Sequence, residues 1–273
     1  MADKPVLPKE YTPLTFEQLP VGSEFGPITF SVSEISHSKT IQLHNENLLK
    51  GSSAVLDVLL PSEMWSWARV LSPRFGRLNE VLLAKSCWEL YGTATPGEEM
   101  TGRTGVIKQE IRKDLRYVTT VTDTKNASGK LLMRCVEDVL LLHDAPPMFY
   151  TERPIVDELH GPCVHECARR VYFRFDWNNG HWLNNIHVDG YARTLGYERG
   201  LPEFIMYMDW MFLSALTVYG DAFWQSGMIT IKKILPVYAG DVVRILVNRD
   251  HDKHVVRFLR DDQVRLVADI TIA

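Results

Sequence analysis

The residue types best suited to proton transfer gather in the segment NNIHVD, which contains Asn184, His187 and Asp189. A neutral imidazole is the side chain that titrates closest to pH 7, so it serves well as a general acid or base. The segment has the composition of a loop, and aspartate is a residue type that caps helices, so we expect Asp189 to cap a helix that begins at Gly190. The pattern fits a catalytic histidine, and it fits a structural histidine equally well.

A second group of chemically capable residues lies in the segment HGPCVHEC. It contains His160, Cys163, His165 and Cys167. The last three alternate along the chain, so on a strand they would share one face. Their spacing differs from the usual ligand pairs of zinc sites. We therefore favour the start of a half-buried strand over a metal site, and we expect neither a metal nor another cofactor.

Composition limits the kind of partner. The 273 residues carry a formal net charge of -4, which argues against nucleic acid because phosphate binding needs clustered Lys and Arg. No apolar run reaches the roughly 20 residues of a membrane span. The segment 1–13 is polar and contains several prolines, unlike a signal peptide. We expect a cytoplasmic protein with a small-molecule substrate and without a membrane partner.

The elements that position these residues follow from apolar periodicity in the first part of the chain. Alternation predicts strands at 28–32 and 130–143, and the segments 82–91 and 104–121 are rich in strand-forming residues. Turns are expected in TPGEEM and NASG between them. A helical pattern opens at Ser33, and a second helix is expected within the apolar segment 54–71, where Pro61 suits a first helical turn. A linker follows the prolines near 146 and runs to about residue 161.

The second part of the chain repeats this order. Leu60-Pro61 reappears as Leu201-Pro202, and Pro96-Gly97-Glu98 reappears as Ala239-Gly240-Asp241. An apolar helix follows each Leu-Pro pair, and strand patterns follow each glycine turn, the last ones at 242–249 and 255–272. Two such offsets of about 140 residues indicate a duplicated unit. Each unit combines one buried central helix with antiparallel strands, which predicts an α+β fold.

Three motifs carry a resemblance to a known family. They are the opening from Phe16 to Glu34, the segment from Asn184 through Arg199, and the turn LPVYAGDV that begins at Leu235. Together they resemble the MaoC-like dehydratases, the (R)-specific enoyl-CoA hydratase superfamily, in its double-hotdog branch. The resemblance implies two hotdog domains, at 14–144 and 162–273, with the active site in the second. It also implies a monomer or a homodimer, because one chain already contains a pair of domains.

The family's working motif is Asp-x-Asn-Pro-Leu-His-x-Asp, in which the first Asp and the His activate a water molecule. The resemblance assigns the catalytic base to His187, the orienting amide to Asn184 and the last carboxylate to Asp189. Trp182 stands where the family has its catalytic Asp, and an indole cannot exchange a proton. The resemblance leaves Trp182 and Asp189 as residues that contact the substrate.

A second departure lies at the start of the central helix. The family places a His-Gly pair there, whose backbone amide polarises the thioester carbonyl, and this chain has Glu203-Phe204. We take Glu203 as the candidate replacement carboxylate, with a simple helix cap as the alternative, and the amide at Phe204 as the oxyanion donor. Asp176 and His181 are further candidates. Four tryptophans could line an acyl or aromatic pocket or could belong to the core: Trp177, Trp182, Trp210 and Trp224.

The favoured function is reversible addition of water to an acyl thioester of the enoyl-CoA kind. It requires one acid/base group and one amide aimed at the developing enolate oxygen. Because the family's Asp is missing, an isomerase, cyclase or thioesterase on the same scaffold is the alternative. A non-catalytic acyl-binding subunit is a third possibility, since a fold does not fix a reaction.

Overall fold

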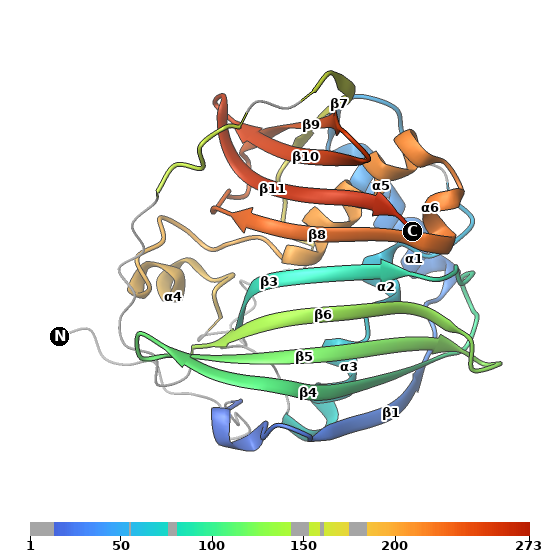
Figure 1. Ribbon diagram of the computed structural model, residues 1–273, viewed down its shortest axis with the longest axis vertical. Helices are drawn as coiled ribbons and strands as arrows, with labels where there is room; N and C mark the ends of the chain where they lie inside the picture. Colours follow the sequence, from blue (N-terminus) through green and yellow to red (C-terminus); the bar gives the residue numbers. More distant parts are fainter. Residues whose placement is uncertain (1–13, 55, 76–80, 143–152, 159–160, 175–184) are drawn as a thin grey trace.

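The computed structural model describes residues 14–54, 56–75, 81–142, 153–158, 161–174 and 185–273 (Figure 1). Within these ranges, eleven strands form one continuous sheet in the order β1-β4-β5-β6-β3-β8-β11-β10-β9-β7-β2. Every pair of neighbouring strands is antiparallel. The predicted combination of an antiparallel sheet with buried helices is therefore present.

The sheet consists of two units with the same strand order. The first unit contains β1 (Glu24–Phe30), β3 (Val81–Leu90), β4 (Met100–Arg112), β5 (Leu115–Asn126) and β6 (Leu131–Leu141). The second contains β7 (Cys163–Arg170), β8 (Gly227–Ile234), β9 (Val242–Asp250), β10 (Lys253–Arg260) and β11 (Gln263–Ile272). The units join where β3 pairs with β8, and the short β2 (Leu48–Lys50) extends the opposite edge beside β7.

Helices cover one face of this sheet. In Figure 1, α3 (Trp67–Phe75) lies behind the strands of the first unit and α5 (Phe204–Tyr219) behind those of the second. Most side chains of α5 are buried, including Trp210 and Phe212, as expected for a helix that is apolar on nearly all sides. The remaining helices are η1 (Phe16–Gln18), α1 (Glu34–Glu46), α2 (Pro61–Met64), α4 (Asp189–Thr194) and α6 (Ala222–Ser226).

In the first unit, the helix expected within the segment 54–71 is divided into two. There α2 ends at Met64, because Trp65 has extended backbone angles (φ −62°, ψ 118°). The next helix, α3, starts at Trp67. Trp65 and Trp67, on either side of the break, both line the space between the two units.

Two predicted strands are each a hairpin. The segment 104–121 turns back at Lys113 and Asp114, and the segment 255–272 turns back at Asp261 and Asp262. All four turn residues have positive φ values between 48° and 65°. Left-handed pairs of this kind are usually marked by Asn-Gly or Asp-Gly. Neither turn contains glycine, so the sequence pattern predicts one continuous strand segment where the structure has two strands and a turn.

The internal repeat is visible at the two glycine turns. Gly97 and Gly240 both have left-handed backbones, with φ values of +86° and +92°. The amide of Gly97 donates to the Val32 carbonyl (2.7 Å), and that of Gly240 donates to the Val171 carbonyl (2.8 Å). The two turns thus make the same contact in their two units.

The boundaries 14–144 and 162–273 stay a prediction, because α1 and β2 cross between the units. They belong to the first part of the chain, yet β2 pairs with β7, and His44 of α1 contacts Asp209 of α5.

Cys163, His165 and Cys167 lie on β7, whereas His160 is outside the described residues. In the described ranges, no three His, Cys, Asp or Glu side chains are grouped to hold a metal ion, and no helix is long and apolar enough to cross a bilayer.

Candidate active site

A cavity of about 430 Å³ lies between the two units. The first unit contributes Trp65, Trp67 and residues of β3 and β6; the second contributes the loop at 186–187, the start of α5 and the turn at 234–237. Among the residues predicted for the site, His187, Glu203 and Phe204 all line this cavity. The walls are otherwise mainly apolar, which is typical of a pocket that buries an acyl chain.

The orientation of His187 is set by its neighbours. Its Nδ1 donates a hydrogen bond to the Leu201 carbonyl (2.5 Å), and its backbone amide donates to Asn185 Oδ1 (2.8 Å). In the neutral ring, Nε2 is then the nitrogen that accepts a proton. Burial lowers the pKa of His187 below its usual value of 6.5, while the charge of Glu203 raises it. His187 is therefore neutral and able to act as a base at pH 7.

Asp189 holds the histidine loop in place and does not line the cavity. The prediction that its side chain caps the helix is wrong: Asp189 is the first residue of α4, and its Oδ1 accepts from the Gly200 amide (2.9 Å). Its other oxygen pairs with Arg193 (3.2 Å) at the surface. The Leu201 amide adds a parallel bond to the Ile186 carbonyl (2.9 Å).

The two loops approach so closely that position 200 has no room for a side chain. A Cβ atom on Gly200 would lie 2.2 Å from the His187 carbonyl oxygen, which is backbone and cannot rotate away. We predict that Gly200→Ala separates the loops, destabilises the protein by about 1–3 kcal/mol and displaces His187. Gly190→Ala is the matched control, since nothing lies within 4 Å of its Cβ position. Equal melting temperatures for the two variants would contradict this prediction.

Glu203 immediately precedes α5 and is 5% exposed. Its side chain makes no capping hydrogen bond to α5. The alternative, in which Glu203 only caps the helix, is therefore wrong. Glu203 Oε2 accepts instead from the backbone amide of Arg174 (2.9 Å). Amides in the first turn of a helix have no partners within the helix. The Phe204 amide thus belongs to a set of donors at the cavity end of α5.

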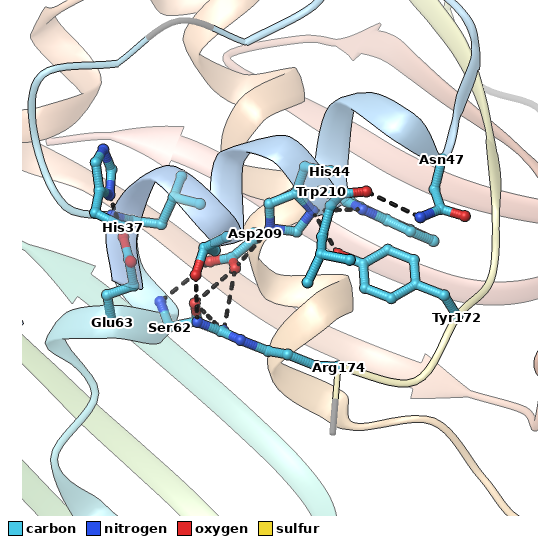
Figure 2. A network of polar contacts seen from close by, with 12 residues as sticks. His37, His44, Asn47, Ser62, Glu63, Tyr172, Arg174, Asp209 and Trp210 are labelled. Atoms are coloured by element: carbon cyan, nitrogen blue, oxygen red, sulfur yellow. Dashed lines mark hydrogen bonds and ion pairs between the residues drawn. The ribbon is translucent and has the colours of Figure 1, made fainter. Parts of the chain in front are cut away.

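The Arg174 side chain anchors the segment that reaches Glu203. It donates to Ser62 Oγ (2.8 Å) and Thr40 Oγ1 (3.0 Å), and it lies 3.9 Å from Asp209 (Figure 2). These partners come from α2, α1 and α5. Arg174 is therefore held against three helices.

Asp209 is the centre of this buried network (Figure 2). It is fully buried in α5 and accepts from the backbone amide (3.1 Å) and hydroxyl (2.6 Å) of Ser62 and from His44 Nε2 (3.1 Å). The Trp210 indole and the Tyr172 hydroxyl both contact His44 Nδ1. A buried carboxylate with this many donors is satisfied, so we assign the network a structural role behind the cavity.

Sequence reasoning missed the polar residue at the first-unit end of the cavity. Glu137, in β6, is completely buried and lines the cavity. Its two oxygens accept from the indoles of Trp65 (3.1 Å) and Trp88 (3.2 Å). Burial raises its pKa from 4.5 to about 7, although the indole hydrogen bonds act in the opposite direction. A signal was present, because Glu137 shares the buried face of its strand with Cys135 and Val139.

Two of the other predicted residues are described, and neither reaches the cavity. Trp210 and Trp224 belong to the hydrophobic core and do not line it. The remainder lie outside the described residues: Asn184, Trp182, Asp176, His181 and Trp177. The turn motif of the second unit does reach the site, through Pro236 and Val237.

Comparison with known proteins places the fold. No family model matches the sequence, and no curated protein matches it significantly. Among solved structures, a MaoC-like dehydratase is 10% identical with a TM-score of 0.66, over 94% of this chain and 99% of that chain. A conserved hypothetical protein of Mycobacterium tuberculosis that has a double hotdog fold is 11% identical, with a TM-score of 0.56 over 95% of this chain and 98% of that one.

A putative oleoyl thioesterase of Lactobacillus plantarum is also similar, at 11% identity and a TM-score of 0.52, over 92% of this chain and 98% of that chain. These likenesses confirm the predicted α+β double hotdog, the fold that the chain shares with MaoC-like dehydratases. Identities this low show the fold alone, so the reaction has to be argued from the residues of the cavity.

Proposed function

We propose that this protein adds water to, or removes water from, an acyl thioester that carries a double bond next to the carbonyl. The observation that carries the proposal is the meeting of His187, Glu203 and the N-terminus of α5 in one apolar cavity. An imidazole or a carboxylate can supply the acid/base group that such chemistry requires, and an amide donor can stabilise the developing enolate oxygen. One chain contributes both walls of the cavity, which fits a monomer or a homodimer.

The proposed mechanism assigns one role to each group. A water molecule between His187 Nε2 and the Glu203 carboxylate loses a proton to one of them while its oxygen bonds to C3 of the enoyl group. The thioester oxygen becomes an enolate, which the Phe204 amide stabilises. C2 then takes up a proton from the group that received it, so both side chains return to their starting state. Asn184, as the resemblance implies, would orient the water or the ring.

Hydrolysis of the thioester is the second candidate, because one similar structure is that of a putative thioesterase. The same water would then attack the carbonyl carbon, and the thiolate would leave as a thiol. Purified protein incubated with a trans-2-enoyl-CoA separates the two reactions. Loss of the conjugated double bond without release of thiol supports hydration. Release of thiol supports hydrolysis. If the double bond persists and no thiol is released, both reactions are contradicted.

The pH dependence tests the pairing of the two side chains. The pKa of His187 is lowered by burial, so kcat/KM should fall in acid only below pH 6.5, where the imidazole becomes protonated. Because the charge of Glu203 raises that pKa, Glu203→Gln should move this acidic limb to still lower pH. It should also lower activity at every pH if the carboxylate contacts the water. A limb that stays in place would show that Glu203 does not act on His187.

A further inference from the structure

Stacked indoles form the part of the cavity wall that the first unit contributes. Trp65 stacks on Trp67, with ring centroids 5.8 Å apart and planes inclined by 10°, and on Trp88, at 6.2 Å and 20°. Trp65 and Trp67 line the cavity, while Trp88 does not. Phe204 and Tyr207 of α5 contribute two further aromatic rings to the lining. Flat aromatic walls favour a flat aromatic ligand, through stacked and edge-on contacts.

The stack is held in place by a single carboxyl group. Glu137 accepts one hydrogen bond from the Trp65 indole and one from the Trp88 indole, and it has no exposed surface of its own. Both rings are thereby fixed in rotation as well as in position. Burying a carboxyl group in an apolar wall is unfavourable for folding, which suggests that the orientation of these rings matters.

Trp67 supplies a buried hydrogen-bond donor without an acceptor among the residues that the structure describes. Its side chain is 4% exposed, and among the described residues none accepts a hydrogen bond from its Nε1. A buried indole N–H normally finds an acceptor, because leaving it unpaired is costly. Trp67 lines the cavity, so an oxygen atom of a bound ligand that reached this N–H would satisfy it.

We infer that the acyl group bound at this end of the cavity is aromatic and carries an oxygen atom that accepts from the Trp67 indole. The inference rests on the proposed function, since it takes the cavity to hold the acyl part of a thioester. It gives the stacked tryptophans the role of determining specificity, and Glu137 the role of positioning them.

Unreactive thioethers of pantetheine allow binding to be measured separately from turnover. The series carries 3-cyclohexylpropyl, 3-phenylpropyl, 3-(3-methoxyphenyl)propyl and 3-(4-methoxyphenyl)propyl groups, and calorimetric titration gives each dissociation constant. We expect the phenyl compound to bind about 2- to 10-fold more tightly than the cyclohexyl compound, from aromatic contacts beyond buried area. One of the methoxy compounds should gain a further 2- to 10-fold, about the contribution of one hydrogen bond.

Two variants of Trp67 separate the ring from its donor. Trp67→Phe keeps an aromatic ring and loses the N–H, so it should abolish the methoxy advantage and keep most of the phenyl preference. Trp67→Leu should abolish the methoxy advantage and also reduce the phenyl preference, of which Trp65, Phe204 and Tyr207 keep a part. Trp224→Phe is the matched control, because Trp224 is a buried indole (5% exposed) that does not line the cavity. Its ligand preferences should equal those of the wild type.

Equal binding of the phenyl and cyclohexyl compounds to the wild type would overturn the inference. So would a methoxy advantage that is absent from the wild type or that survives in Trp67→Phe. Failure of the proposed function is seen elsewhere: the predicted binding preferences combined with no reaction of any enoyl thioester would contradict the catalysis and leave the aromatic site standing. Turnover of aliphatic substrates without any aromatic preference would contradict only the aromatic site.

Discussion

Replacing His187 with asparagine should lower turnover of an enoyl thioester by about 10²- to 10⁴-fold, the usual contribution of a positioned acid/base group. Asparagine places an amide nitrogen near the position of Nδ1, so it can keep the hydrogen bond to the Leu201 carbonyl. It has no counterpart of Nε2. The variant therefore removes the proton acceptor and preserves the contact that joins the two loops.

His187→Gln is the complementary variant. Its longer side chain places an amide near the position of Nε2 and gives up the bond to Leu201, so it should lose both turnover and thermal stability. His187→Asn should melt close to the wild type. The rates come from the loss of the conjugated double bond, and the melting temperatures come from circular dichroism. A folded His187→Asn protein with native turnover would rule out a catalytic role and leave acyl binding as the better account.

The sequence predicted one half of the site and missed the other. His187 is indicated by its residue type and its neighbours in sequence, and the resemblance assigns Glu203 and Phe204 to the start of the apolar central helix. Trp65, Trp67 and Glu137 lie far from them in sequence and come from the other unit, so only the packing of the two units brings them to the cavity. Local patterns carry no information about such contacts.

The fold was predicted more completely, because it depends on periodicity and on the internal repeat. The exceptions have local causes. The hairpins at Lys113-Asp114 and Asp261-Asp262 lack the glycine that usually marks such turns. The first central helix breaks at Trp65, where the indole bonds to Glu137. The hydrogen bond between Trp65 and Glu137 joins residues far apart in sequence, so a local sequence pattern does not predict it.

Protonation of Glu137 should make the free energy of unfolding depend on pH. Its pKa is raised by burial from 4.5 to about 7 in the folded protein. The folded state thus favours the protonated carboxyl group, and this contribution to stability is complete below about pH 4.5 and is lost as the pH rises through 7. The difference between the two pKa values corresponds to about 3 kcal/mol.

Glu137→Gln cannot titrate and should escape this loss. Its amide meets the two indole N–H groups less favourably, a cost that is the same at every pH, so the quantity to follow is the change with pH. From about pH 4 to about pH 8, the free energy of unfolding of the variant should rise by about 3 kcal/mol relative to the wild type, in urea titrations at each pH. Glu99→Gln serves as the control, since that side chain is exposed. If the difference between Glu137→Gln and the wild type is the same at both ends of the range, the carboxyl group does not titrate there, and the prediction is contradicted.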